Sequence, residues 1–333
     1  MPVRLALALA LAAAAAPASA QPVAPPGRPI AIAIHGGAGT LTREAITPAL
    51  EAGIRADLDR ALDAGHAVLA SGGSALDATQ AAVQVLEDSP HFNAGHGAVF
   101  THEGRNELDA AIMDGETRRA GAVAGLTTVR NPIQAARAVM EQSPHVMLVG
   151  EGAERFARER GLTTVDPSYF RTEHRWEQLQ RALAREAAEA SVEPSSRYGT
   201  VGAVALDRHG HVAAATSTGG MTNKRWGRVG DAPVIGAGTW AQPGCAVSAT
   251  GWGEFFIRLH IAADVCARVA YRGDGLAEAA GQVIGTELPA LGGDGGLIAI
   301  DGEGRIAMPF NTSGMYRGWI GADGARGTAV FAD

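Results

Sequence analysis

Apolar residues follow two patterns along the chain, short unbroken runs and longer stretches with helical spacing. The short runs are bounded by glycine, proline or polar residues, which is typical of buried strands. The longer stretches repeat apolar residues three and four positions apart, which is typical of amphipathic helices. Strands are therefore predicted over 30–34, 108–114, 120–129, 146–149, 200–206, 212–216, 234–240, 246–249, 298–300 and 305–308, and helices over 51–70, 74–86, 131–141, 151–159, 173–190, 254–271 and 276–284.

Local signals support several of these boundaries. Ser74 followed by Asp77 resembles a capping box, and Pro132 suits the first turn of a helix. The glycine-rich segment 35–40 and the polar segment 87–100 are predicted loops. Strands group together and helices group together in each half of the chain. This grouping favours packed sheets with helices outside them over a regular βαβ winding.

The composition narrows the class of protein. The chain has 333 residues, of which 46% are hydrophobic and 19% charged, enough for one large domain or two small ones. The formal net charge is -7 and no basic run occurs, which disfavours binding to nucleic acid.

The first twenty residues have the organisation of a signal peptide. Arg4 precedes a Leu/Ala-rich apolar run over 5–16, and the segment 18–20 (ASA) fits the small-residue cleavage rule. The apolar run is too short for a stable membrane span. We expect cleavage before Gln21 and a periplasmic or secreted protein with no membrane anchor; the alternative is a retained anchor.

Two cysteines are present, Cys245 and Cys266. Export would permit a disulfide. Cys266 shares a predicted helical face with Phe256 and Ala262, however, so we expect a buried free thiol.

Several common catalytic chemistries lack their motifs. The segment 35–37 (HGG) is similar to an α/β-hydrolase oxyanion loop, but no serine stands in a Gly-x-Ser-x-Gly frame. Ten histidines occur without His-Glu-x-x-His or Cys-x-x-Cys spacing, which disfavours a catalytic metal. A P-loop and a dinucleotide-binding fingerprint are also missing from the sequence.

Gly199-Thr200 stands where a polar, Ala/Glu-rich stretch changes to a strand-like run. Cleavage of this bond would give Thr200 both a hydroxyl nucleophile and an α-amine, which can act as its own base. The alternative is that Thr200 simply begins a strand. Polar clusters follow over 215–224, 227–231 and 248–251, and together they offer hydroxyls, an arginine for a carboxylate and an aspartate for an amine.

At these motifs the sequence resembles the plant-type asparaginase / isoaspartyl peptidase (β-aspartyl-peptidase) family of N-terminal-nucleophile hydrolases. The resemblance covers nearly all of the chain after the signal segment. It runs through 35–39 (HGGAG), 92–100 (FNAGHGAVF), 107–110 (ELDA), 113–115 (MDG), 120–125 (AGAVAG), 130–132 (RNP), 141–146 (EQSPHV), 199–207 (GTVGAVALD), 215–224 (ATSTGGMTNK) and 227–231 (GRVGD).

The resemblance implies an α+β fold, a four-layer αββα sandwich, and a precursor that cuts itself between Gly199 and Thr200. The halves 21–199, with a linker over about 187–199, and 200–333 would form one catalytic domain and an (αβ)2 heterotetramer. Substrates would be isoaspartyl dipeptides and L-asparagine. The implied roles are Thr200 as nucleophile, Thr218 as its orienting hydroxyl, Arg228 and Asp231 as ligands of the substrate α-carboxylate and α-amine, and Thr250 and Gly251 as oxyanion donors.

The resemblance implies no catalytic cofactor but a structural sodium ion, held by main-chain carbonyls of Leu86, Glu87, Ser89, Phe92, Ala94 and His96. The chain departs from the family pattern in its signal segment and in a spacing between Asp231 and Thr250 that is about one residue short. Three alternatives remain: a glycosylasparaginase-like amidase, a taspase-like endopeptidase, and an exported binding protein that has kept the fold without catalysis.

Overall fold

Two β-sheets form the centre of the molecule. The computed structural model describes residues 28–39, 43, 46–188 and 199–332, so the predicted signal segment 1–20 and most of the linker 187–199 lie outside the described residues. The larger sheet has the strand order β12 (Arg326–Phe331), β11 (Gly314–Ile320), β1 (Ala31–Gly39), β5 (Val201–Leu206), β6 (Val212–Thr218), β2 (Leu108–Asp114), β3 (Ala120–Leu126) and β4 (Met147–Val149). The smaller sheet has the order β10 (Ile306–Ala307), β9 (Gly295–Asp301), β8 (Cys245–Gly251) and β7 (Thr239–Gln242).

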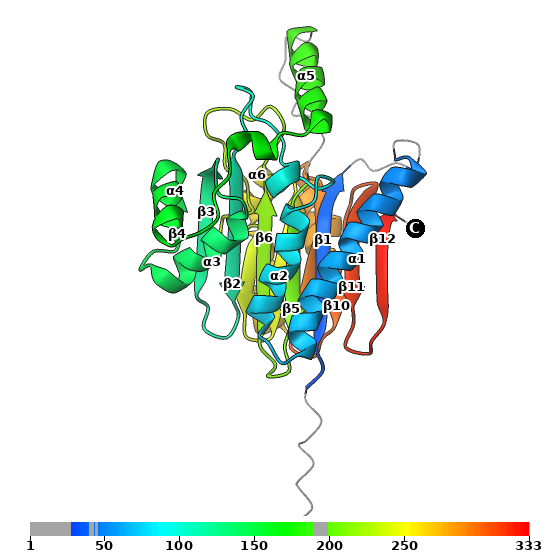
Figure 1. The fold of residues 1–333 in the computed structure, drawn as a ribbon. Helices are drawn as coiled ribbons and strands as arrows, with labels where there is room; N and C mark the ends of the chain where they lie inside the picture. The colour runs from blue at the N-terminus through cyan, green and yellow to red at the C-terminus, as the bar shows by residue number, and fades with distance from the viewer. Residues whose placement is uncertain (1–27, 40–42, 44–45, 189–198, 333) are drawn as a thin grey trace, which may run out of the picture.

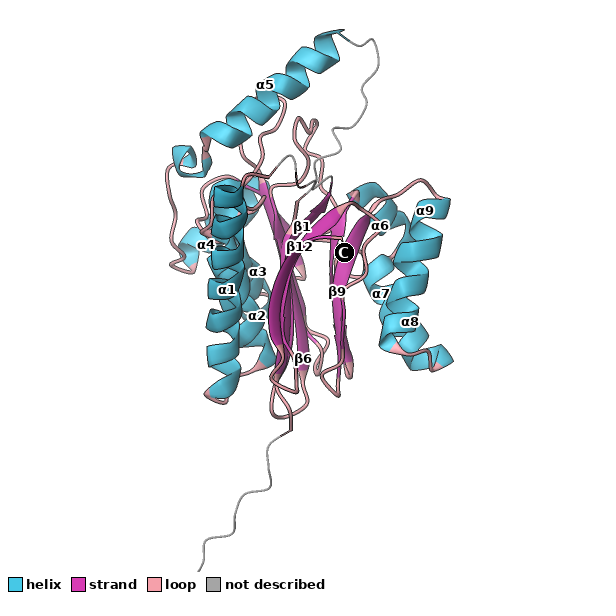
Figure 2. Cartoon of the chain, turned by 90° about the vertical axis from the view of Figure 1, so that its right-hand side faces the viewer, coloured by secondary structure: helices cyan, strands magenta, loops and turns pink. Residues whose placement is uncertain are grey.

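Helices cover the outer face of each sheet, as Figure 2 shows. The larger sheet is covered by α1 (Pro48–Ala70), α2 (Ala75–Glu87), α3 (Pro132–Gln142) and α4 (Gly150–Glu159), and the smaller by α6 (Gly253–Leu259), α7 (Ile261–Ala267), α8 (Leu276–Gln282) and α9 (Leu288–Ala290). Helix α5 (Glu173–Ala188) projects from one end of the molecule (Figure 1). The predicted four-layer αββα sandwich is confirmed. Within the described residues, no helix is both long and apolar enough to cross a membrane.

Short helical segments complete the chain. They are the 3-10 turns Gly95–Gly97 and Pro167–Phe170 and the π-helical turns Arg268–Arg272 and Val283–Glu287.

Three apolar cores separate the four layers. Along β1, Ile32 and Ile34 pack toward the helices, while Ala31 and Ala33 pack toward the smaller sheet. Successive side chains of a strand point to opposite faces, so each central strand needs apolar residues at every position. The third core lies between the smaller sheet and its helices. This double burial explains why the strands appear in the sequence as unbroken apolar runs.

The helix starts follow their local signals. The Ser74 hydroxyl accepts a hydrogen bond of 3.1 Å from the backbone N–H of Asp77, so the predicted cap of α2 is confirmed. The Thr47 hydroxyl caps α1 in the same way, and Pro132 stands in the first turn of α3 as predicted.

Several sequence predictions are wrong in detail. The glycine-rich segment 35–39 is not a loop, because β1 continues through it with a bulge between His35 and Gly37 and pairs with β11. The predicted strand 234–240 is mostly a turn closed on Asp231, and only its end belongs to β7. The predicted helix 254–271 is interrupted at His260, which has a left-handed backbone (φ 51°). The strands β11 and β12 are not predicted at all.

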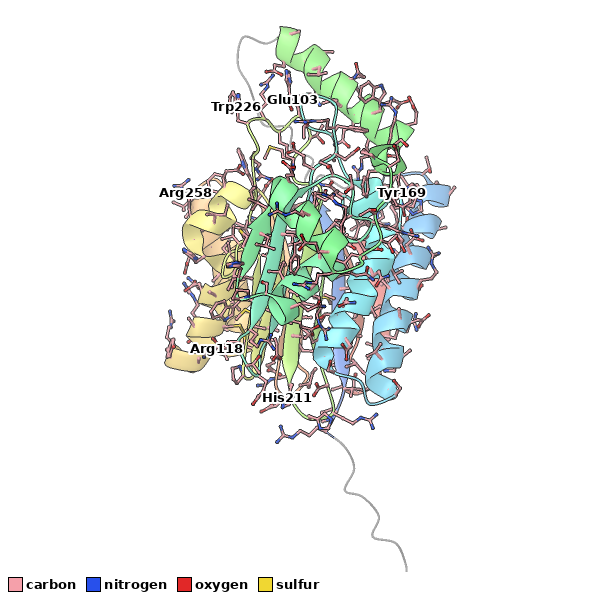
Figure 3. The ribbon with its side chains drawn as sticks, turned by 60° about the vertical axis from the view of Figure 1, so that its left-hand side comes forward. Glu103, Arg118, Tyr169, His211, Trp226 and Arg258 are labelled. Carbon is pink, nitrogen blue, oxygen red and sulfur yellow. A yellow bond between two sulfur atoms is a disulfide. The ribbon has the colours of Figure 1, made fainter. Side chains whose placement is uncertain are left out.

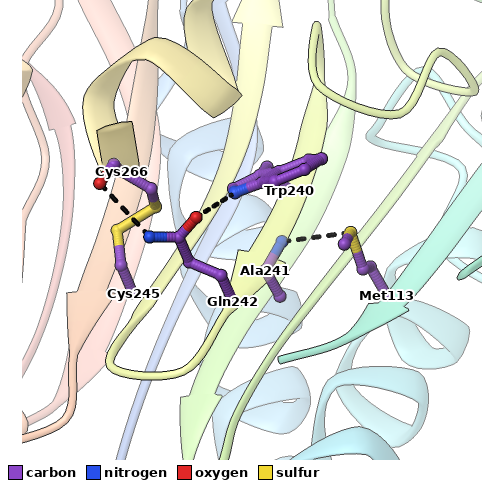
Figure 4. Close-up of a disulfide and its surroundings, with 6 residues drawn as sticks. All are labelled: Met113, Trp240, Ala241, Gln242, Cys245 and Cys266. Atoms are coloured by element: carbon purple, nitrogen blue, oxygen red, sulfur yellow. Dashed lines mark hydrogen bonds between the residues drawn. A yellow bond between two sulfur atoms is a disulfide. The ribbon is translucent and has the colours of Figure 1, made fainter. Parts of the chain in front are cut away.

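The prediction of free cysteines is also wrong. Cys245 at the start of β8 and Cys266 in α7 form a disulfide, with their Cα atoms 5.7 Å apart. Figure 4 shows the bond beside Gln242, whose side-chain amide donates to the carbonyl of Cys266. The helical face that carries Cys266 is packed on the strand that carries Cys245, a proximity that one helix's periodicity does not reveal.

Candidate active site

The Gly199–Thr200 bond lies where strand β5 begins, next to the end of its antiparallel neighbour β6. Thr200 comes directly before β5, and Thr218 is the last residue of β6. Since β5 and β6 pair with Val201 opposite Ser217, the start of one strand meets the end of the other. The Thr200 Oγ1 consequently donates to the Thr218 Oγ1 at 3.1 Å, and both side chains are buried.

The carbonyl of Gly199 accepts two hydrogen bonds, from the Thr218 hydroxyl at 3.2 Å and from the Asn93 side-chain amide at 2.7 Å. The single hydroxyl proton of Thr218 is used on this carbonyl, so Thr218 accepts from Thr200 and from the N–H of Gly220. Two donors on one carbonyl withdraw electron density from its carbon. The arrangement therefore activates the carbonyl next to the hydroxyl that would attack it.

Asn93 is a functional candidate that the sequence analysis did not single out. Its amide also donates to the carbonyl of Gly220 at 2.7 Å, and its side-chain oxygen accepts from the N–H of Val99. These bonds fix the rotamer and the amide orientation of Asn93. It stands within the family-like segment 92–100, so its motif was visible although its contact was not.

The buried side chain of His35 forms a hydrogen bond with the backbone of Thr200. The carbonyl of Thr200 can only accept, so His35 Nδ1 donates to it at 2.8 Å. Burial lowers the pKa of His35 to about 3, although the bond to Thr200 acts in the opposite sense. The neutral ring therefore uses Nε2 as an acceptor, and the Ser248 hydroxyl lies 2.9 Å from it. A Cβ on Gly202 would lie 2.5 Å from this Nε2, so β5 needs glycine there.

A small cavity unites most of the predicted site residues. Its walls include Thr200, Thr218, Arg228, Asp231 and Gly251, together with Gly199, Gly220, Met221 and Gly230. The cavity volume is about 10 Å³, room for one water molecule. With the Gly199–Thr200 bond intact, this space is too small for a dipeptide.

Arg228 is held by a neighbouring carboxylate. Its Nε and Nη2 donate to the two carboxylate oxygens of Glu254, each at 2.9 Å. Nη1 lies outside this pair of bonds, and a Cβ on Gly230, which lines the cavity with Arg228, would lie 2.7 Å from it. Trp226 of the same loop lies at the α5 end of the molecule, opposite His211 (Figure 3). Sequence analysis missed Glu254, because its partner is 26 residues away.

Asp231 is a buried acid with an unpaired oxygen. Its Oδ2 has no hydrogen-bond partner among the described residues. Burial raises the pKa of Asp231 to about 7, while the nearby charge of Arg228 acts in the opposite direction. A cation in the cavity would satisfy this oxygen and favour the charged carboxylate.

Thr250 and Gly251 end the strand β8. Gly251 lines the cavity, whereas Thr250 is not among its described lining residues. The buried hydroxyl of Thr250 accepts from the N–H of Ala38 at 3.3 Å. That contact uses a lone pair of the hydroxyl and not its proton.

The loop after α2 packs its backbone closely against two glycines. A Cβ on Gly95 would lie 2.3 Å from the carbonyl oxygen of Glu87, and one on Gly97 would lie 2.1 Å from that of Phe92. Carbonyl oxygens are the ligand type that hard cations prefer. The six predicted sodium ligands are neighbours in the chain: Leu86 and Glu87 end α2, and Ser89, Phe92, Ala94 and His96 follow it. The sodium ion itself stays a prediction. Among the described residues, no group of three or more His, Cys, Asp or Glu side chains is placed to hold a metal.

Comparison of the sequence with known proteins identifies the family of this chain. The family model described as Asparaginase matches residues 28–330. The chain is 52% identical to an isoaspartyl peptidase of Escherichia coli (strain K12), over 91% of this chain and 96% of that protein. It is 42% identical to a probable isoaspartyl peptidase/L-asparaginase 2 of Arabidopsis thaliana (90% and 98%) and 43% identical to a plant-type L-asparaginase of Pyrococcus furiosus (86% and 94%). The chain therefore belongs to the asparaginase family of N-terminal-nucleophile hydrolases.

Proposed function

We propose that this protein is a self-cleaving amidohydrolase that acts on isoaspartyl dipeptides and L-asparagine with Thr200 as its nucleophile. One observation carries the proposal. The Thr200 hydroxyl donates a hydrogen bond to the Thr218 hydroxyl, which itself donates to the carbonyl of Gly199. These residues line one small cavity together with Arg228 and Asp231. The names of the relatives support the same two substrates.

Maturation uses the activated carbonyl. The Thr200 Oγ1 attacks the carbon of Gly199, a C–O bond forms, and the C–N bond breaks as the nitrogen takes up a proton. This shift frees the α-amine of Thr200. Water then hydrolyses the resulting ester, which releases the carboxylate of Gly199 and restores the hydroxyl of Thr200. Asn93 and Thr218 stabilise the developing charge on the Gly199 oxygen through their two hydrogen bonds.

Hydrolysis of a substrate repeats this chemistry with the new α-amine as base. The amine takes the hydroxyl proton as Thr200 attacks the side-chain carbonyl of the substrate, and returns it to the leaving nitrogen. Thr250 and Gly251 donate hydrogen bonds to the carbonyl oxygen of the substrate as it becomes negatively charged. Water then hydrolyses the acyl-enzyme to release aspartate.

Specificity comes from Arg228 and Asp231. Both substrates carry a free α-carboxylate and an α-ammonium on one carbon, and the two side chains bind these groups with opposite charges. An ordinary α-linked aspartyl peptide lacks the free carboxylate at that carbon, so it is a poor substrate.

The working form is a pair of chains, 21–199 and 200–333, exported to the periplasm or medium after removal of residues 1–20. Two such pairs assemble into an (αβ)2 heterotetramer, and a sodium ion stabilises the carbonyl loop after α2. No cofactor takes part in catalysis.

The test combines mass spectrometry with assays on L-asparagine and β-aspartyl-leucine. Wild-type protein yields a chain that begins at Thr200 and hydrolyses both substrates. Thr200→Ala stays uncut and inactive, and Thr200→Ser matures slowly or keeps weak activity. An uncut wild-type protein with full activity would contradict the proposal, and a cut protein without activity on either substrate would favour a binding protein.

A further inference from the structure

A second and larger cavity lies next to the small one. Its volume is about 510 Å³, within the range of small-molecule sites. Gly199 belongs to the walls of both cavities. Cleavage after Gly199 detaches this residue from Thr200, so the two spaces can join once the chain has matured. The larger cavity, whose described lining includes neither Arg228 nor Asp231, would then open onto the small one.

The wall of this cavity combines an apolar surface with one arginine and two imidazoles. Ile46, Leu50 and Ile54 provide aliphatic surface, and the rings of Phe92 and Tyr316 meet edge to face with centroids 5.9 Å apart. One basic side chain, Arg175, and two imidazoles, His91 and His174, also line it, and the His91 ring is paired with the buried carboxylate of Asp57 at 2.7 Å. No Asp or Glu occurs among its described lining residues. The wall therefore suits a ligand with an apolar body and a carboxylate.

One polar atom in the wall lacks a partner. Gln178 is 4% exposed and lines the cavity, and its Nε2 makes no hydrogen bond to a described residue. Its side-chain oxygen accepts from Arg175 Nη1 at 3.0 Å, which fixes the orientation of the amide. A buried donor without a partner is costly, so an acceptor on a ligand is the expected complement.

We propose that this cavity is the subsite for the leaving residue of isoaspartyl dipeptides. The α-carboxylate of that residue accepts from Gln178 Nε2 and is attracted by Arg175, while its apolar side chain packs on Leu50, Phe92 and Tyr316. The inference rests on the proposed function and deepens it. L-Asparagine releases only ammonia, so it makes none of these contacts.

The experiment compares kcat/KM for β-aspartyl-leucine, its C-terminal amide, β-aspartyl-glycine and L-asparagine. With wild-type protein, β-aspartyl-leucine exceeds both its amide and the glycine dipeptide by about tenfold, the effect of one charge-assisted hydrogen bond or one apolar side chain. Gln178→Leu lowers the acid-to-amide ratio by about tenfold. Gln180→Leu, an exposed position on the same helix, keeps the wild-type ratio.

Equal kcat/KM for the acid and the amide in wild-type protein would overturn the subsite, and this comparison needs no variant. An unchanged ratio in self-cleaved Gln178→Leu would do so as well. Both results leave the proposed function intact, because asparagine and dipeptides are still hydrolysed. A cleaved protein that turns over neither class would instead overturn the proposed function, and the subsite with it.

Discussion

At the scale of single residues, burial controls the charge that the site offers. Asp231 is the clearest example, because burial raises its pKa to about 7. The neutral acid cannot form an ion pair with a substrate ammonium, and the α-amine of a mature Thr200 must also be neutral to act as base. That amine has an ordinary pKa of about 7.7–8.0.

We therefore expect kcat/KM for β-aspartyl-leucine to fall as the pH is lowered through 7, with a slope approaching two on a logarithmic plot. Both groups gain a proton in this range, and each protonation removes activity. The measurement is a pH profile of kcat/KM with constant ionic strength. A profile that is flat down to pH 5 would show that neither group limits activity.

Arg228 permits a second prediction at this scale. Two of its guanidinium nitrogens, Nε and Nη2, already bond Glu254, and Nη1 lies outside this pair of bonds. Arg228→Ala removes the proposed partner of the substrate carboxylate. It should weaken transition-state binding of both substrates by several kcal/mol, which lowers kcat/KM roughly a hundredfold or more. Self-cleavage needs no bound substrate, so the variant still yields the two chains.

Arg228→Lys is the matched variant, since it keeps the charge and loses the fork. It should recover part of the activity that Arg228→Ala loses. Near-normal turnover of both substrates by fully cleaved Arg228→Ala would instead make Arg228 a structural ion-pair residue of Glu254.

At the scale of elements, the disulfide ties the strand β8 to the helix α7. It closes a loop with a sequence separation of 21 residues. Cross-linking a loop of this length restricts the unfolded chain and stabilises a protein by about 3 kcal/mol. The same strand ends in Thr250 and Gly251, and the helix after it begins beside Glu254, so the tether also braces elements of the site.

Cys245→Ala/Cys266→Ala protein should accordingly lose about 3 kcal/mol of unfolding free energy. The measurement is guanidinium denaturation of both proteins without reductant. Wild-type protein unfolded and refolded in reductant is the control, and it should match the variant. Equal stability of variant and oxidised wild type would contradict the assignment of a stabilising role.

At the scale of the whole molecule, the two halves of the chain are interleaved in one sheet. The strand β1 from the first half lies between β11 and β5 from the second, and β2 pairs with β6. The core under the helices likewise contains residues of both halves, for example Ile32 and Val201. The proposed cleavage after Gly199 would therefore cut one connection and leave the strand pairing of the sheet intact.

We expect the chains 21–199 and 200–333 to copurify after cleavage and to separate only under denaturing conditions. Gel filtration of the native protein and mass spectrometry of its denatured chains test this, and N-terminal sequencing of exported protein should begin at Gln21. A mature exported chain that begins at Met1, or chains that separate without denaturant, would contradict the expectation.

The sequence by itself determined the layer type, most element positions and the identity of the predicted site residues. Strands that are buried on both faces appear in the sequence as apolar runs, and a helix cap such as Ser74 depends on neighbouring residues only. Both can therefore be found without a structure. Motif order along the chain indicated Thr200, Thr218, Arg228 and Asp231. Only the tertiary structure decided which distant residues meet, because sheet pairing and packing join segments far apart in the chain. The Asn93 bond to Gly199, the Glu254 fork on Arg228, the disulfide and the strands β11 and β12 all depend on such meetings.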